Sequence, residues 1–425
     1  MSQRPTQGVR LLAPALVLMV DAAVADDDVA DDAVADEEEP LPHWASRPRV
    51  EGGGVPSLQE LCCEVLAKHL HAIGSLDALP DHLAELVRAA IQRDRRLIDD
   101  SGLAVWLAAV SRGGSTTRLD LRWASSLTDH GLKMLATEEA MWASTLLELD
   151  LSFCELISDA GMKALAPALT SLNTLVLTGC TRCADGACEA IGRHMSQLER
   201  IELELLALVT DVGVQAIVRG CGSRLCDLRL GSCYRITSVS TSLVADHCRT
   251  TIRHLGLGGL STLNDIDCEE IGRCHGLTGL ELCACPKVSD AGIKQIGLLA
   301  SRQMKAYAAW DQRSAAFKMA GGSAPPPPTL TFLDLGGLTR LSDEALQKLL
   351  ARTAHLTTLD LRGCTRLEPN GLTTVFAGKT IDGVQTSVSL PVPRLQTLTL
   401  TSVDAANDRV ASLITEARPA LALKR

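Results

Sequence analysis

The sequence has very few aromatic residues. Phe, Trp and Tyr together make up 3% of its 425 residues, whereas hydrophobic residues of all kinds make up 46%. A core built on large aromatic side chains is therefore excluded, and the apolar interior has to consist of aliphatic residues. Thin layers that each hold a few aliphatic side chains satisfy this condition.

Positive charge is also scarce. The formal net charge is -10, and residues 1–40 account for -8 of it, because two arginines there face ten acidic residues. The remaining chain carries -2 and lacks the basic stripe of a nucleic-acid groove, so we expect no direct nucleic-acid binding by the folded part. Residues 1–54 show no consistent apolar period and are predicted to be a disordered acidic leader, which solubilises the chain or holds a basic partner.

Catalytic and metal-binding motifs are missing. The chain has no H-E-x-x-H or G-x-S-x-G motif. Gly378-Lys379-Thr380 resembles the end of a phosphate loop, but Thr373 stands where that loop requires glycine. The fifteen cysteines are odd in number and form no paired C-x-x-C set of the zinc type. We therefore predict a chain that is not an enzyme, has no cofactor and no metal, and keeps its thiols reduced.

Long apolar runs are absent as well. No stretch after the leader is apolar enough to cross a membrane, and we expect no membrane partner. Arg10 precedes the apolar residues 11–20, and Ala23-Val24-Ala25 resembles a signal-peptidase site, which leaves a secretory signal at residues 1–25 open. The many cysteines expected to be reduced disfavour that interpretation, and we predict a location in the nucleus or the cytoplasm.

A short phrase, in contrast, recurs along most of the chain. Its clearest copy is Leu149-Asp150-Leu151-Ser152-Phe153-Cys154, which is followed by Ser158-Asp159-Ala160-Gly161. Intervals between successive copies are 25 to 30 residues, apart from two longer ones of 53 and 39. A pattern L-x-L-x-x-C with this period is typical of leucine-rich repeats. The copies begin at Leu119, Leu149, Leu175, Ile201, Leu228, Leu255, Leu280, Leu333, Leu359 and Leu398.

The chemistry of one unit predicts its structure. Alternate strand residues face one side, so Leu149 and Leu151 point into the core and Asp150 points out. Cys154 ends the strand, where its weak S–H donor can serve a buried loop carbonyl, and Ser158 is a helix N-cap. One unit cannot bury its apolar face alone, so the units must stack. We predict an α/β fold, a right-handed β-α solenoid of the ribonuclease-inhibitor type, with a parallel sheet on the concave side and helices outside.

We divide the chain into the leader at 1–54, a helical segment at 55–112 and the solenoid at 113–425. The helical segment either docks an adaptor or only caps the first repeat, and the residues alone leave both interpretations open. Two insertions account for the two longer intervals. One is predicted near 301–328, where a proline run should loop out, and the other near 378–393.

Leu398–Leu400 is predicted to be the last strand, followed by a closing helix at 409–417. Strand residues beside the inward leucines should line the concave face, where acidic residues recur with arginines beside several of them. A rigid polar sheet suits recognition of another macromolecule, although for any single residue the simpler interpretation is a solvent-facing position. The predicted partner-binding residues are Asp120, Arg122, Asp150, Ser152, Thr178, Glu202, Glu204, Arg229, Glu281, Asp334, Asp360 and Arg362.

The repeat with L-x-L-x-x-C and [ST]-D-x-G resembles the F-box/leucine-rich-repeat proteins. The stretches 56–62, 79–83, 95–97 and 103–107 resemble the start of the Rad-seven-type nucleotide-excision-repair proteins. This resemblance implies the substrate-recognition subunit of a cullin-type E3 ubiquitin ligase, a nuclear monomer within a hetero-complex. The expected partners are an elongin-C- or Skp-like adaptor, a cullin and a protein substrate.

The resemblance also implies where the adaptor binds. Trp106 departs from the spacing of the F-box tryptophan, which leaves open which adaptor binds. The alternative is a non-enzymatic leucine-rich-repeat scaffold for protein–protein interaction with no ligase link. By motif, the adaptor contact falls on Leu79, Pro80, Leu83, Leu86 and Val87.

Overall fold

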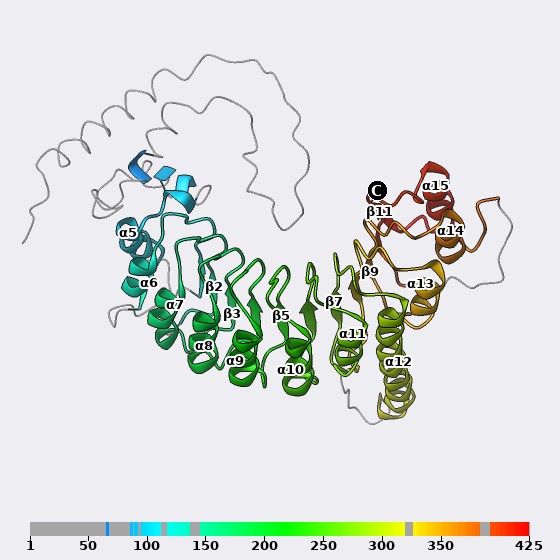
Figure 1. The fold of residues 1–425 in the computed structure, drawn as a ribbon, viewed down its shortest axis with the longest axis horizontal. Helices are drawn as coiled ribbons and strands as arrows, with labels where there is room; N and C mark the ends of the chain where they lie inside the picture. Colours follow the sequence, from blue (N-terminus) through cyan, green and yellow to red (C-terminus); the bar gives the residue numbers. More distant parts are fainter. Residues whose placement is uncertain are drawn as a thin grey trace, which may run out of the picture. The chain divides into compact units, whose positions relative to one another are not determined.

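The chain forms two compact units, Met1–Leu169 and Thr170–Arg425. A computed structural model describes residues 65–67, 86–87, 89–91, 95–111, 117–136, 145–318, 326–382 and 392–424. Within each unit a short strand, a loop and a helix alternate along the chain (Figure 1). The predicted leader at 1–54 lies outside the described residues, and the three predicted domain boundaries stay predictions.

The first unit contains two parallel strands, with Leu119 opposite Leu149. Residues 65–67, 86–87 and 89–91 are helical. A helix over Asp100–Ser111 lies within the segment predicted to be helical. The labelled elements are η2 (Arg95–Leu97), α5 (Asp100–Ser111), β1 (Arg118–Asp120), α6 (Asp129–Leu135), β2 (Glu148–Asp150), α7 (Asp159–Leu165) and η3 (Ala166–Ala168).

The second unit repeats the same pattern. Its strands follow one another in chain order, and each pairs in parallel with the next. The elements are β3 (Thr174–Val176), α8 (Asp185–His194), β4 (Arg200–Glu202), α9 (Asp211–Cys221), β5 (Asp227–Arg229), α10 (Ser238–Cys248), β6 (His254–Gly256), α11 (Asp265–Ile271), β7 (Gly279–Glu281), α12 (Asp290–Lys318), β8 (Phe332–Asp334), α13 (Asp343–Leu350), β9 (Thr358–Asp360), α14 (Pro369–Ala377), β10 (Thr397–Thr399), α15 (Asp408–Ala417) and β11 (Ala422–Lys424).

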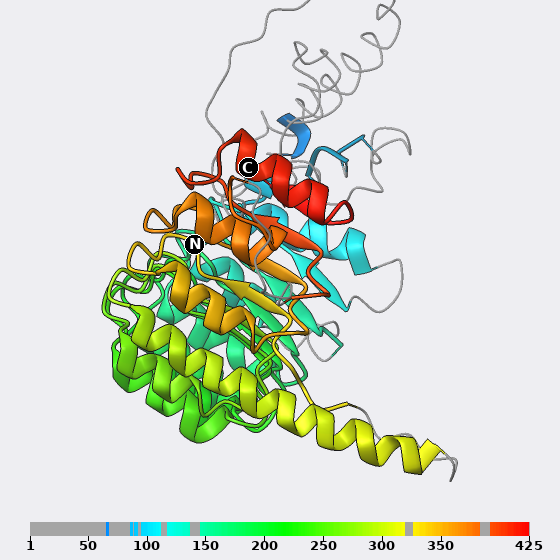
Figure 2. The same ribbon diagram turned by 90° about the vertical axis from the view of Figure 1, so that its right-hand side faces the viewer.

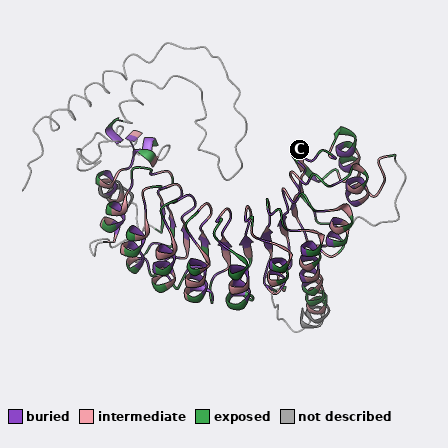
Figure 3. Ribbon diagram, viewed as in Figure 1, coloured by how far each residue is buried: buried purple, intermediate pink, exposed green. Residues whose placement is uncertain are grey.

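All ten predicted strand positions are confirmed, and their leucines form the core (Figure 3). The strand-end cysteines are buried thiols that bond to the preceding repeat, as Cys233 Sγ donates to the Leu203 carbonyl at 2.9 Å. Cys285 and Cys364 do the same toward Leu257 and Leu335. Burial raises the pKa of Cys233 to about 12, so this thiol stays protonated at neutral pH.

In most repeats an aspartate at the start of the helix holds the next repeat in place. Asp185 accepts hydrogen bonds from the Thr210 amide at 2.8 Å, from the Thr210 hydroxyl at 2.7 Å and from the Gly213 amide at 3.0 Å. The Thr210 hydroxyl in turn caps α9 by accepting from the Val212 amide. A Cβ on Gly213 would lie 2.6 Å from Asp185 Oδ1, which explains the glycine in [ST]-D-x-G. Further aspartates that accept from the next helix start are Asp100, Asp129, Asp211, Asp265, Asp290 and Asp343.

One prediction about the second unit is wrong. Leu398 is not in the last strand, because β11 follows α15 and pairs with β10. Residues 301–318, inside the predicted insertion, continue α12, which runs unbroken over Asp290–Lys318 and extends past the helices beside it (Figure 2). The alanine-rich sequence before the proline run has high helix propensity, so it extends the existing helix. None of the described helices is long and apolar enough to cross a membrane.

Candidate functional site

In each unit, helices cover one face of the sheet and leave the other face open (Figure 1). Side chains on this open face come from the strand residues that flank each inward leucine. In the second unit they form three rows that run across β4 to β8. The first row is Arg200, Asp227, His254, Gly279 and Phe332, the central row is Glu202, Arg229, Gly256, Glu281 and Asp334, and the third row is Glu204, Gly231, Gly258, Cys283 and Gly336.

The open face of the first unit carries an ion-pair cluster around Asp120. Arg122 binds Asp120 through two nitrogens at 3.0 and 2.9 Å, and Arg95 lies 3.5 Å from the same carboxylate. Burial favours the neutral acid, but the two arginines outweigh it and hold the pKa of Asp120 below its usual value. Asp150 accepts from the Ser152 hydroxyl, and there burial prevails and raises the pKa.

Arg229 is the centre of the network in the second unit. Its guanidinium lies 3.6 Å from Glu202, 3.4 Å from Asp227 and 3.5 Å from Glu281. Burial opposes the charge on Arg229, yet the surrounding carboxylates outweigh it and raise its pKa. Arg200 adds a second cation, with its Nε 2.9 Å from Glu202 and 3.5 Å from Asp227. These contacts fix the side chains before any partner arrives, which lowers the entropy lost on binding.

Glycines create the space for this network. Gly256 lies between Arg229 and Glu281 in the central row, and a Cβ there would come within 3.2 Å of Arg229 Cγ and 3.3 Å of Glu281 Oε2. Gly279 leaves room for the His254 ring, which lies 3.6 Å from both Asp227 and Glu281. The sequence prediction missed Asp227, Arg200 and His254, although each directly precedes an inward leucine or isoleucine of its repeat.

Glu204 differs from the other acids of the open face. Among the described residues, no hydrogen bond or ion pair reaches its carboxylate within contact distance. Burial, together with the nearby negative charge of Glu281, raises the pKa of Glu204 to about 7. Its carboxylate lies above Gly231, since a Cβ there would be 3.4 Å from Glu204 Oε1. Glu204 is therefore the carboxylate of this face best placed to accept a new cationic partner.

A third ion-pair cluster lies on the open face at β8 and β9. Arg362 Nη2 lies 3.1 Å from Asp334 and 3.0 Å from Asp360, and Asp334 also accepts from the Gly336 amide at 2.8 Å. A Cβ on Gly336 would be 2.9 Å from Arg362 Cγ, so glycine again admits the arginine. Acidic residues thus exceed basic ones in the central row of the second unit.

Comparison with known proteins agrees with this architecture. A family model described as Leucine Rich repeat matches residues 143–166 and 354–375. The chain has the fold of a leucine-rich-repeat solenoid. It is 25% identical over 384 residues to the DNA repair protein rhp7 of Schizosaccharomyces pombe, an alignment that covers 86% of this chain and 62% of that relative. The chain thus spans less than two thirds of the length of rhp7.

Two solved structures are similar to this leucine-rich-repeat chain at low identity. The yeast Rad7 chain, crystallised in complex with Elc1, has 17% identity and a TM-score of 0.39, over 87% of this chain and 92% of that one. The leucine-rich-repeat-containing protein LegL7 from Legionella pneumophila has 15% identity and a TM-score of 0.41, over 66% and 83%.

The structure places the predicted partner-binding residues of the leucine-rich repeats on the open faces, but not all are accessible. Ser152 and Thr178 are each only 6% exposed, and Asp334 is 4% exposed. These three line the face and offer a partner little area. Arg122 and Arg200, with 51% and 44% of their side chains exposed, present more surface.

The predicted adaptor residues are described only in part. Leu79, Pro80 and Leu83 lie outside the described residues. Leu86 is half-buried, whereas Val87 is fully buried, as is Ile91 one turn later. A direct contact by Val87 with an adaptor would therefore require a local rearrangement.

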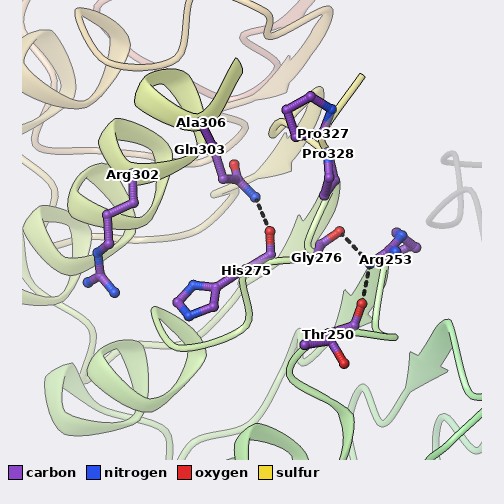
Figure 4. A pocket seen from close by; sticks show the side chains of 9 residues that line it. All are labelled: Thr250, Arg253, His275, Gly276, Arg302, Gln303, Ala306, Pro327 and Pro328. Atoms are coloured by element: carbon purple, nitrogen blue, oxygen red, sulfur yellow. Dashed lines mark hydrogen bonds between the residues drawn. The ribbon is translucent and has the colours of Figure 1, made fainter. Parts of the chain in front are cut away.

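A cavity of about 360 Å³ lies where the extension of α12 meets the repeats (Figure 4). Its walls include Arg253, His275, Arg302 and the two prolines at 327–328. The buried Gln303 fixes this region, because its Nε2 donates to the Leu277 carbonyl at 2.7 Å and its Oε1 accepts from the Leu330 amide at 3.0 Å. The lining holds no carboxylate or cysteine, and no group of metal-ligating side chains occurs among the described residues.

Proposed function

We propose that this chain is the substrate-recognition subunit of a cullin-type ubiquitin ligase that acts in DNA repair. The observation that carries the proposal is the extent of the similarity to rhp7, which is named a DNA repair protein. The alignment covers 86% of this chain, which is a longer stretch than the predicted solenoid from residue 113 onward. The similarity therefore includes part of the segment that precedes the repeats.

That preceding segment is the proposed adaptor contact. An elongin-C- or Skp-like adaptor would bind around Leu79, Pro80, Leu83, Leu86 and Val87 and link the chain to a cullin, in the nucleus or the cytoplasm. The chain would act as a monomer within this complex and contribute no catalytic residue. Its effect on rate would come from proximity, because it holds the target close to the ubiquitin-loaded enzyme.

The open faces are the proposed surface for the target protein. Their ion-pair networks are already ordered, and acids outnumber cations around Arg229. A target segment that presents lysine or arginine would complement this charge, with Glu204 as the carboxylate that has no partner of its own.

One observation favours the alternative of a plain scaffold. Val87 and Ile91 are fully buried in the free chain, as expected for a helix that only caps the first repeat. In that case residues 55–112 dock no adaptor, and the repeats bind their partners without any link to a ligase.

A binding titration separates the two functions. Purified elongin C, in complex with its natural partner elongin B, is titrated into the full chain and into the variant Leu83→Asp, Leu86→Asp. Val65→Asp serves as control, because Val65 is 39% exposed in a neighbouring helical stretch. The proposal predicts saturable binding that the double variant loses and the control keeps, with circular dichroism showing that both variants are folded. Absence of binding to elongin C and to a Skp adaptor alike would favour the scaffold.

A further inference from the structure

Exposed large apolar side chains gather at one place in the second unit. The described residues include seven such side chains, and Val65 and Leu147 are the two that lie elsewhere. The other five belong to three consecutive repeats, where they lie in the loops that lead from strand to helix or in the first turn of the helix. They are Leu208 at 43% exposure, Val212 at 55%, Tyr234 at 59%, Val239 at 54% and Ile266 at 69%. Single exposed apolar residues are ordinary, but a contiguous group points to an interaction site.

The fold itself does not require these residues. Val212, Val239 and Ile266 each occupy the second position of their helices. The same position in other repeats holds His130, Ala160, Gly186, Ala291 and Glu344. The solenoid therefore tolerates polar or small residues there, and β-branched apolar residues in three successive repeats are a feature of this surface.

Hydrogen bonds between repeats hold these positions next to one another. The Thr237 amide donates to Asp211 at 2.9 Å and thereby joins the start of α10 to the start of α9. The Thr241 hydroxyl donates to Asp267 at 2.7 Å and joins α10 to α11. Isolated parallel β-bridges also join the loops of neighbouring repeats, one between Ala184 and Leu208 and one between Thr210 and Arg235.

Cations flank the apolar group, and their charges are not neutralised. Arg182, Arg235 and Lys287 are exposed, and no carboxylate lies within ion-pair distance of them among the described residues. The carboxylates of the same edge are directed into the stack, where Asp211 accepts from Thr237 and Asp265 accepts from Ser289. The outward-facing charge of this edge is therefore positive.

We propose that this loop edge, defined by Leu208, Val212, Tyr234, Val239 and Ile266 with Arg182, Arg235 and Lys287, docks a protein segment that combines carboxylates with large apolar side chains. The positive charge selects carboxylates, and the exposed aliphatic side chains gain from apolar burial. A nucleic-acid backbone would match the cations alone and leave the aliphatic side chains without partners, so a protein segment fits better. The edge is separate from the open face, and it can hold a second partner while the target is bound.

A selection from a random peptide library tests the proposal. A phage-displayed library of 16-residue peptides is selected on the full chain. Recovered peptides are measured by fluorescence anisotropy on the full chain and on two variants, Val239→Asp with Ile266→Asp and Arg235→Glu with Lys287→Glu. These side chains are exposed, so the variants should fold. Leu147→Asp and Arg193→Glu, at exposed positions away from the edge, are the matched controls.

The proposal predicts peptides rich in Asp or Glu together with Leu, Ile or Phe. Each edge variant should weaken their binding at least about tenfold, while the controls change it less than about twofold. Failure to enrich such peptides, or equal binding to edge and control variants, would overturn the proposal. Displacement of the peptides by a 16-base-pair DNA duplex would assign the edge to nucleic acid instead. Binding that appears only after deletion of residues 1–54 would show that the chain's own acidic stretch covers the edge.

Discussion

Ala284 and Gly337 occupy the same turn in consecutive repeats, and both have left-handed backbone angles, with φ of 53° and 69°. The turn recurs after the other strands and is filled either by glycine or by residues such as Phe153 and Leu205. A non-glycine residue in this region carries a strain of about 1–2 kcal/mol. The position in the turn therefore determines the backbone conformation, whichever residue occupies it.

A reciprocal pair of substitutions tests this strain. Gly337→Ala should lower the free energy of unfolding by about 1–2 kcal/mol, since alanine gains the left-handed strain. Ala284→Gly should raise it by up to about 1 kcal/mol, because relief of strain exceeds the added backbone entropy of glycine. Urea unfolding of the two variants measures both values. Equal destabilisation by the two substitutions would contradict the strain argument.

Glu204 predicts a specific dependence of stability on pH. Its pKa in the folded chain is raised to about 7 by burial and by neighbouring carboxylates, above the usual value of 4.5. Between pH 4.5 and 7 the folded state therefore keeps a proton that the unfolded state has lost. The contribution of Glu204 to the free energy of unfolding is lost as the pH rises through this range. Glu204→Gln should be more stable than the natural chain at pH 8 by about 1–2 kcal/mol, after allowance for solvent screening.

The same substitution should have little effect at pH 3, where Glu204 is protonated in both states. Glu199→Gln is the matched control, because Glu199 is 45% exposed and pairs with Arg224. Chemical unfolding across this pH range measures the difference. A Glu204→Gln effect that is constant with pH would show that the carboxylate is not perturbed by its surroundings.

At the scale of elements, an aspartate at the start of most helices joins one repeat to the next. Asp185→Ala would leave the Thr210 and Gly213 amides without their acceptor, and we expect a loss of about 2–3 kcal/mol in the free energy of unfolding. Asp246→Ala is the comparison, since Asp246 forms an exposed ion pair with Arg273, whose loss should change the free energy of unfolding very little. Equal losses in urea unfolding would show that the aspartate serves only its own helix.

The sequence pattern predicted the elements well but not how they connect. The period of L-x-L-x-x-C located ten of the eleven described strands, because alternation and stacking follow directly from burial. Ser158 was correctly identified as an N-cap, yet its hydroxyl also donates to Asp129 of the preceding repeat, a contact that needs the stacked geometry. How far α12 continues could not be predicted from the sequence, because helix propensity alone does not fix the residue at which a helix ends.

At the scale of the whole molecule, the binding surfaces depend on residues that lie far apart in the chain. The predicted acids and arginines do line the open faces, because strand alternation fixes their direction. The Arg229 network could not be predicted, since it needs Gly256 and Gly279 to bring side chains of different repeats together. The apolar loop edge was also missed, because Val212, Val239 and Ile266 are separated by about one repeat each and show no local pattern.

Adaptor binding and target binding are proposed for different parts of the chain. Two variants separate them: Leu83→Asp with Leu86→Asp for the helical segment, and Glu204→Gln with Glu281→Gln for the open face. Glu199→Gln with Asp246→Asn is a matched control, because these acids are exposed and lie outside the rows of the open face. All four chains must first show the same circular dichroism spectrum.

The most direct test is affinity capture of each chain from cells, followed by quantitative mass spectrometry of the proteins that bind. We predict that the natural chain and the control retain an adaptor, a cullin and a set of target proteins. The helical-segment variant should lose the adaptor and the cullin but keep the targets, and the open-face variant should show the reverse. If no adaptor or cullin accompanies the natural chain, or if both variants lose the same proteins, the proposed division of the ligase subunit is wrong.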